Sequence, residues 1–163
     1  MTAKILKNFY KTGSDSEDDE DNSKLDVEKL LTALDNENNS SIGDLTSAKI
    51  KTYKNNALQK LQLPRDELKK LHKKLENYRL IEEMEDLQYG HHIRWIRLTN
   101  PEKIFLTNGG IVCDIQVINE EAHVRCFNRY KKLMQIKLDE CYIFQKLSDQ
   151  EQVILNVLDY LAK

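Results

Sequence analysis

Three histidines are the first residues of this chain that suggest a metal site. His91 and His92 are adjacent, and His123 follows further along. Imidazole is a frequent metal ligand, but neighbouring residues of a strand point to opposite faces, so His91 and His92 are poorly placed to hold one ion together. No Asp or Glu stands at ligand spacing beside them. The sequence therefore predicts no metal site and no cofactor.

The candidate nucleophiles are the three cysteines, Cys113, Cys126 and Cys141. Their odd number, wide spacing and lack of a C-x-x-C pair argue against a disulfide framework and against a standard zinc site. Cys113 and Cys126 fall on the apolar phase of alternating segments, where thiols are usually buried and inert. No paired carboxylates or serine triad stand out. We therefore expect reduced, mostly buried thiols and no enzymatic activity.

Cations and aromatic residues cluster in the same half of the chain and favour recognition over catalysis. Arginine and aromatic side chains together can stack on rings and pair with anionic groups. In the alternative interpretation Trp95 fills the core and the arginines only line the surface. The predicted partner-binding residues are Arg94, Arg97, Arg125, Phe127, Arg129 and Tyr130.

A second cationic group lies in a helical segment, between leucines that recur at steps of three and four. It consists of Lys69, Lys70, Lys73 and Lys74. A basic stripe of this kind can bind the phosphates of a nucleic acid. Acidic residues interleave with the lysines, however, so an ordinary solvated helix face is the alternative interpretation.

The N-terminal part is acidic. Residues 1–47 carry 5 Lys/Arg and 11 Asp/Glu, a net of −6, whereas residues 48–163 carry 20 and 16, a net of +4. The run S-D-S-E-D-D-E-D predicts a disordered segment. Ser14 and Ser16 each precede an acidic residue by three positions and are candidate phosphorylation sites. The segment is either a solvating spacer or a decoy that competes for a basic surface.

No apolar run approaches the length of about 20 residues that crosses a bilayer, and the first residues are too polar for a signal peptide. We therefore expect a soluble, intracellular protein without a membrane partner.

Apolar periodicity predicts three helical segments and one group of strands. Leu25–Leu34 is a short helix, and residues from Ser47 to about Met84 form a helical arm that is either a hairpin or one helix bent at Pro64. A closing helix follows the capping box Ser148-Asp149-Gln150-Glu151 and carries Val153, Ile154, Val157, Leu158 and Leu161 on one face. After Gly90 the period changes to two. Strands are predicted at His91–Leu98, Lys103–Thr107, Ile111–Ile118, Ala122–Phe127, Leu133–Leu138 and Cys141–Leu147.

Short strands with tight turns, flanked by helices, predict an α+β protein built on a small antiparallel SH3-like β-barrel, with an OB-like barrel as the alternative. The predicted domains are an acidic tail (1–24), a short helix and linker (25–46), the helical arm (47–86), and the barrel with its C-terminal helix (87–163).

Two stretches support a comparison with known proteins. L-Q-Y-G-H-H-I-R-W, residues 87–95, resembles the start of SH3-like and Tudor-like barrels. L-T-N-G-G-I-V-C-D-I and I-F-Q-K-L-S-D-Q-E, residues 106–115 and 143–151, resemble small uncharacterised proteins of nucleocytoplasmic large DNA viruses. That resemblance implies a viral protein of the host cytoplasm or the virion and brings no activity with it.

The function expected from these observations is non-enzymatic binding of another protein, in a viral assembly or transcription complex. The barrel face and the helical arm would supply the contacts. Direct nucleic-acid binding through the basic stripe and the same barrel face is the alternative.

Overall fold

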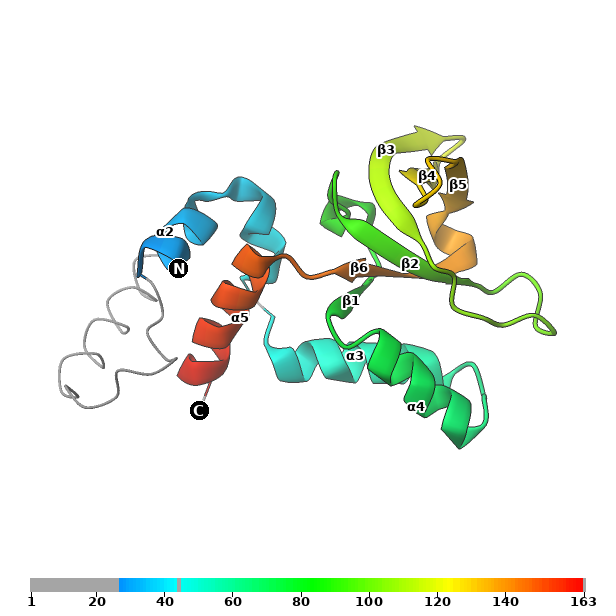
Figure 1. The fold of residues 1–163 in the computed structure, drawn as a ribbon, viewed down its shortest axis with the longest axis horizontal. Helices are drawn as coiled ribbons and strands as arrows, with labels where there is room; N and C mark the ends of the chain where they lie inside the picture. The colour runs from blue at the N-terminus through cyan, green and yellow to red at the C-terminus, as the bar shows by residue number, and fades with distance from the viewer. Residues whose placement is uncertain (1–26, 44, 163) are drawn as a thin grey trace. The chain divides into compact units, whose positions relative to one another are not determined.

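The computed structural model describes residues 27–43 and 45–162 (Figure 1). The predicted phosphorylation sites Ser14 and Ser16, and the predicted acidic tail, lie outside these residues. The chain divides into two compact units. Among the described residues, one combines residues 27–43 and 45–47 with residues 149–162, and the other is continuous from Ala48 to Ser148.

The described residues form four α-helices, three short 3-10 helices and six strands. The α-helices are α2 (Val27–Asp35), α3 (Ser47–Gln59), α4 (Arg65–Lys74) and α5 (Asp149–Leu161). The 3-10 helices are η1 (Glu37–Ile42), η2 (Met84–Asp86) and η3 (Leu138–Glu140). The strands are β1 (Tyr78–Ile81), β2 (His92–Arg97), β3 (Gly110–Ile118), β4 (Glu121–Phe127), β5 (Leu133–Lys137) and β6 (Cys141–Lys146).

The strands form one antiparallel sheet in the order β1-β6-β2-β3-β4-β5. Consecutive hairpins join β3, β4 and β5, and β6 returns to lie between β1 and β2. The sheet bends strongly (Figure 1), but β1 and β5 remain at its two ends and do not pair with each other among the described residues. The α+β class is confirmed, whereas the closed barrel that the sequence predicted is not observed.

One core fills the concave side of the sheet. Alternate residues of the strands point inward, as the period of two requires, and the largest of them is Trp95, which is 2% exposed. Its other buried members include Ile93, Val112, Val124, Cys126, Ile136 and Ile143. For Trp95 the alternative interpretation, in which its side chain fills the core, is therefore confirmed.

A second core covers the other side of β2 and β6. Ile96 and Phe144 are fully buried there against Leu58 of α3 and against Leu71 and Leu75 at α4. The central strand β2 is thus buried on both faces. The sequence indicated this, because apolar residues occupy both phases of the strand.

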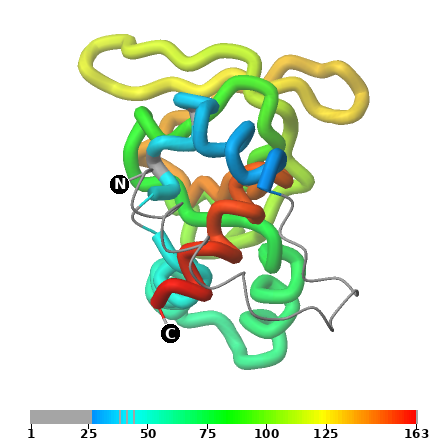
Figure 2. Tube along the Cα trace, turned by 90° about the vertical axis from the view of Figure 1, so that its left-hand side faces the viewer, coloured from blue at the N-terminus to red at the C-terminus, as the bar shows by residue number. Residues whose placement is uncertain are grey.

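The helical arm is two helices, so a hairpin rather than one bent helix follows Ser47. Gln62 adopts φ of 53°, a left-handed conformation that often ends a helix. Pro64 then stands immediately before α4, where its missing N–H is no loss. Figure 2 shows the two helices, in cyan and green, side by side.

Two predicted elements are wrong. The second helix of the arm ends at Lys74 rather than near Met84, because residues 78–81 extend and pair with β6 as strand β1. The predicted strand Lys103–Thr107 is a loop that keeps a single bridge, between Ile96 and Leu106. Asn100 accepts a hydrogen bond from the backbone N–H of Glu102 and so favours a turn there.

A buried lysine ties the two helices of the arm together. The Nζ of Lys54 donates to the carbonyl oxygens of Leu75 (2.8 Å) and Glu76 (3.4 Å), just beyond the C-terminus of α4. A cation is favourable at this end of a helix. Burial, and secondarily the nearby Lys51, lower the pKa of Lys54 from its usual value, while Glu76 acts in the opposite direction.

Replacing this ammonium should destabilise the arm. We expect Lys54→Met to lower the free energy of unfolding by about 1–3 kcal/mol, because a buried and a partly buried carbonyl group lose a charged donor. The exposed Lys51→Met is the matched control and should change it by less than about 0.5 kcal/mol. Urea unfolding followed by circular dichroism measures both, and equal midpoints for the two variants would contradict the capping role.

The unit that contains α2 and α5, which we call the helical unit, brings the two ends of the described chain together. Asn36 and Asn39 both donate to the side-chain oxygen of Gln150 in α5, at 2.9 and 3.1 Å, and Ser47 donates through its backbone N–H to Asp159 at 2.8 Å. The predicted partition placed the C-terminal helix with the strands. In the structure this helix instead shares a unit with α2.

Candidate functional site

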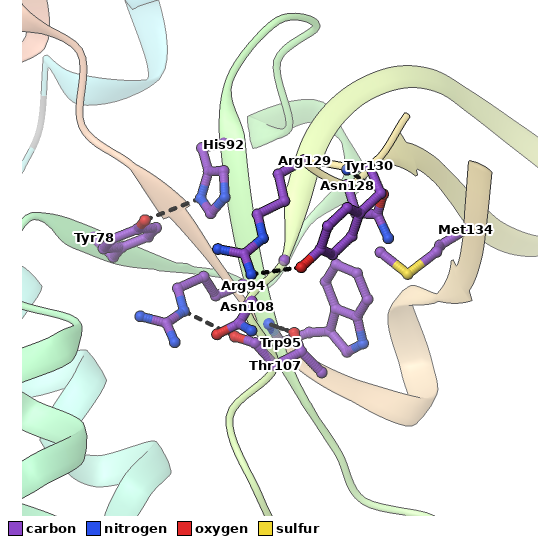
Figure 3. Close-up of a pocket in the computed structure, with 11 residues that line it drawn as sticks. Tyr78, His92, Arg94, Trp95, Thr107, Asn108, Asn128, Arg129, Tyr130 and Met134 are labelled. Carbon is purple, nitrogen blue, oxygen red and sulfur yellow. Dashed lines mark hydrogen bonds between the residues drawn. The ribbon is translucent and has the colours of Figure 1, made fainter. Parts of the chain in front are cut away.

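The structure brings three of the six predicted partner-binding residues to one pocket. Arg94, Arg129 and Tyr130 line a cavity of about 430 Å³ (Figure 3) in the unit of residues 48–148, which we call the sheet unit. Four segments contribute to it: β1, β2, the residues before β3, and the β4–β5 loop with the start of β5. The other lining residues are Tyr78, His92, Trp95, Thr107, Asn108, Gly109, Asn128 and Met134.

Arg94 is fixed by the chain that returns from the 98–109 loop. Its Nε donates to the carbonyl oxygen of Thr107 at 2.8 Å. Thr107 is itself anchored to β2, since its N–H donates to Trp95 O (3.0 Å) and its hydroxyl oxygen accepts from Trp95 N–H (3.2 Å). The guanidinium is therefore positioned on its Nε side, and its two Nη groups make no hydrogen bond or ion pair within the described chain.

The opposite wall is a short, well-defined loop. The side-chain oxygen of Asn128 accepts from the backbone N–H groups of Tyr130 (2.9 Å) and Lys132 (3.0 Å), and Lys131 adopts φ of 61°. The guanidinium of Arg129 donates to the hydroxyl of Tyr130 (2.6 Å) and lies 4.8 Å from the centre of its ring. The Tyr130 side chain is nevertheless 73% exposed, so its ring stands at the rim of the pocket.

A tyrosine–histidine pair forms the third side. The hydroxyl of Tyr78 lies 2.9 Å from Nδ1 of His92. Burial raises the pKa of Tyr78, with Arg94 acting against it. Burial, Arg94 and Lys146 lower the pKa of His92, against a smaller opposing effect of the Asn108 backbone. At neutral pH we therefore assign a neutral imidazole whose Nδ1 accepts a hydrogen bond from the hydroxyl of Tyr78.

The charge around the pocket has one sign. Its lining includes two arginines and no carboxylate. The sheet unit, residues 48–148, carries 19 Lys/Arg and 13 Asp/Glu, a net of +6, whereas residues 1–47 and 149–163 carry 6 and 14, a net of −8. The pocket can therefore attract an anionic group and contact a ring or an aliphatic chain beside it.

The other three predicted partner-binding residues lie outside this pocket. Arg97 is exposed at the end of β2. The Nε of Arg125 donates to the side chain of Gln135 across the strands, at 3.2 Å. Phe127 is 44% exposed and pairs with Ile111 and Leu133, which are also exposed, so these three form a separate apolar patch.

The lysines of α4 are all exposed. Lys69, Lys70, Lys73 and Lys74 make no ion pair with a described residue, and the acidic residues Asp66 and Glu67 share the helix with them. This placement suits either interpretation, a phosphate-binding stripe or a solvated face.

The paired histidines have separate partners. Nδ1 of His91 lies 3.3 Å from the carbonyl oxygen of Lys146, whereas His92 contacts Tyr78. His123 contacts Gln135 at 2.9 Å and lies on a different strand. Within the described residues, no group of three or more His, Cys, Asp or Glu side chains is placed to hold a metal ion.

One of the three cysteines is not where the sequence placed it. Cys126 and Cys141 are buried, but Cys113 is exposed. The register between β3 and β4 shifts between Val112 and Asp114, so Cys113 is an extra residue in a β-bulge. A bulge interrupts the alternation of the strand, and this is the reason why the apolar phase predicted for Cys113 is wrong.

Alkylation should separate these thiols. Burial raises the pKa of Cys126 and of Cys141 to about 11, so both remain protonated and shielded at pH 8. We expect iodoacetamide to modify Cys113 first in the native protein, and all three thiols at similar rates in urea. Peptide mass mapping over time measures this, and native modification of Cys126 as fast as that of Cys113 would contradict the bulge.

Tyr78 and His92 are among the pocket residues that sequence reasoning did not assign to a binding site. Tyr78 was assigned to a helix because it continues the leucine spacing of α4, although the extended pairing of β1 places it beside β2. His92 was weighed only as a metal ligand. The alternation of Tyr78-Arg79-Leu80-Ile81, half-buried and buried in turn, is a strand pattern too short to stand out.

No protein-family model, curated protein or solved structure matches this chain. The resemblance to viral proteins and to SH3-like barrels stays a prediction. Over the part of the chain that the structure describes, none of the helices has the length and apolar character needed to cross a membrane.

Proposed function

We propose that this chain is a non-enzymatic binding protein that recognises another protein through the pocket between Arg94 and Tyr130. The observation that carries the proposal is the lining of that pocket: two guanidinium groups and four rings from separate segments, held by hydrogen bonds of the surrounding backbone. Aromatic and arginine side chains in a concave site are the usual anchors of protein interfaces.

The architecture that suits this proposal is an SH3-like barrel that is left open. In its support, β2 to β5 follow one another as antiparallel neighbours, and β6 returns to pair with β2. These five strands, together with Ile81 of β1 and Leu87, contribute the buried residues of the core that contains Trp95. A viral origin, and an assembly or transcription complex as the setting, remain part of the prediction from the sequence.

Nucleic-acid binding is the second candidate, and the exposed lysines of α4 favour it. Four cations without an ion pair to a described residue, on a unit with a net charge of +6, are suited to phosphate contacts. Within the described chain these lysines are not among the residues that line the pocket.

Photo-cross-linking tests the proposal in the cells that express the chain. Tyr130 is replaced by p-benzoylphenylalanine, which keeps an aromatic ring at the rim of the pocket. The matched control carries the same group at Tyr53, an exposed tyrosine of α3 outside the pocket. We expect an adduct specific to position 130 that resists nuclease and is degraded by protease. A nuclease-sensitive adduct would support the second candidate, and identical adducts at both positions would contradict a pocket-directed partner.

A further inference from the structure

We infer that the pocket is an anion-binding site that receives an acidic side chain of a partner polypeptide, a carboxylate or a phosphate, between Arg94 and Arg129. The inference rests on the proposed function and names the chemistry of the partner. It begins with the two guanidinium groups, which line one cavity from separate segments, β2 and the β4–β5 loop, without a lining carboxylate.

The donors of the two arginines are arranged to receive an anion. Arg94 uses Nε for Thr107 and Arg129 uses one Nη group for Tyr130, so each guanidinium is held by one bond while other N–H groups remain available. A guanidinium matches a carboxylate or a phosphate through two parallel hydrogen bonds. Because Arg94 is already positioned by the anchored Thr107, this arginine loses little side-chain freedom when the anion binds.

Part of the pocket lining is apolar. Trp95 and Met134 lie near the ring of Tyr130, on the side away from the guanidinium of Arg94 (Figure 3), and the Tyr130 side chain is largely exposed. These groups can contact the part of the ligand that carries the anion, such as a ring or an aliphatic stem. A volume of about 430 Å³ is at the small end of ligand sites and has room for one or two side chains.

The surroundings favour a single anion over a strand of phosphates. Binding to a nucleic-acid backbone needs cations along a track. Beyond the pocket, Lys137 is paired with Glu121 (3.0 Å) and Glu140 (3.8 Å), and Arg125 is engaged by Gln135. Within β4 and β5, one of these cations is therefore paired with carboxylates and the other is held by a neutral amide, so the two strands present no continuous track of free cations. Lys131 and Lys132, in the loop beside the pocket, are exposed.

Trp95 makes the inference directly measurable, since it is the chain's single tryptophan and lines the pocket. The full chain is titrated with three pentapeptides that place glutamate, phosphotyrosine or tyrosine between two pairs of glycines, and with a 12-nucleotide oligothymidylate. Indole emission is followed with excitation selective for tryptophan. We expect saturable changes with the phosphotyrosine peptide, the glutamate peptide or both, and none with the tyrosine peptide. The ratio of the affinities for the phosphotyrosine and glutamate peptides shows whether the pocket prefers a phosphate or a carboxylate.

Four variants complete the test. Arg94→Ala and Arg129→Ala should each weaken binding of the anionic peptide about 10- to 100-fold, because a charge-assisted pair is lost. The affinity of Arg94→Lys should lie between those of wild type and Arg94→Ala, since lysine keeps the positive charge but lacks the two parallel donors of a guanidinium. Arg65→Ala removes the same charge from the exposed start of α4 and should change affinity less than about twofold. Melting temperatures confirm that each variant is folded.

Each other outcome overturns the inference. Equal binding of the tyrosine and phosphotyrosine peptides would show an aromatic site without anion recognition. Equal losses in Arg65→Ala and Arg94→Ala would show nonspecific charge attraction. Tighter, arginine-dependent binding of the oligonucleotide would assign the pocket to nucleic acid. A protein adduct at position 130 without any anion effect would leave the proposed function standing and remove this inference alone.

Discussion

Gly109→Ala is expected to lower the free energy of unfolding by at least about 4 kcal/mol, among the largest effects of a single substitution. Gly109 adopts φ of +76°, and a Cβ at this position would stand 1.8 Å from the carbonyl oxygen of Ile93 and 3.1 Å from Cα of Arg94. Both neighbours belong to the backbone of β2. The methyl group fits only if β3 moves away from β2, which breaks the short pairing between these strands.

Gly90→Ala is the matched control for this prediction. Gly90 has almost the same φ, +82°, but apart from its chain neighbours no atom lies within 4 Å of the place that a methyl group would take. The free energy of unfolding of Gly90→Ala should therefore fall by only about 1 kcal/mol, the cost of holding alanine at a positive φ. Urea unfolding followed by circular dichroism compares the two, and failure of Gly109→Ala to fold at all agrees with the prediction. Equal midpoints would show that β2 and β3 separate at no cost.

Gln145→Leu should lower the free energy of unfolding by about 2–4 kcal/mol. Gln145 is fully buried in β6. Its side-chain oxygen accepts from the backbone N–H of Gln88 (2.8 Å), and its amide nitrogen donates to the carbonyl oxygen of Asp86 (3.2 Å). Leucine leaves both backbone groups without this partner. The chain between η2 and β2 should then detach first, seen as faster hydrogen exchange of Gln88.

Two further variants sharpen this test. Gln135→Leu changes an exposed glutamine of β5 and should shift stability by less than about 0.5 kcal/mol. Gln145→Glu keeps an acceptor for Gln88 but donates to Asp86 only when protonated. Burial raises the pKa of such a carboxyl in the folded state above its value in the unfolded chain. The stability of the Gln145→Glu variant relative to wild type should therefore be greatest at a pH below the unfolded-state pKa, and it should fall as the pH rises through the folded-state pKa. A difference that does not depend on pH would contradict the donor role.

The sequence predicted most of the sheet because its strands alternate and their turns are distinctive. β3 to β6 begin and end within one or two residues of their expected limits, and α5 follows Ser148 as expected. Apolar residues on both phases of β2 indicated a strand covered on two sides, and Ile96 and Trp95 do lie in different cores. These features depend on local spacing, which the sequence records directly.

The elements that were missed depend on distant partners. Tyr78 continues the spacing of the α4 leucines, and only its pairing with Lys146 in β6 makes it part of a strand. The bulge at Cys113 depends on the opposing residues of β4. The prediction of a closed barrel was wrong for a similar reason. Whether β1 and β5 pair depends on the curvature of the whole sheet, and neither strand's own sequence indicates it.

The candidate site was half predictable. Arg94, Arg129 and Tyr130 were singled out by residue type, and they do line one pocket. Arg97, Arg125 and Phe127 have the same chemistry but point elsewhere, because strand register and not composition decides which side chains converge. The anchoring by Thr107 and Asn128 involves backbone groups, which have no signature in the side-chain pattern.

The helical unit has a consequence for the order in which the chain matures on the ribosome. Asn36 and its partner Gln150 are 114 positions apart, and the whole sheet unit is encoded between them. At about 5–20 residues per second, α2 is synthesised roughly 6 to 20 s before α5. The apolar side of α2 therefore has no α5 to pack against while the whole sheet unit is being translated. A chain that ends at Ser148 and is released from the ribosome should have a folded sheet and an α2 that is sensitive to protease.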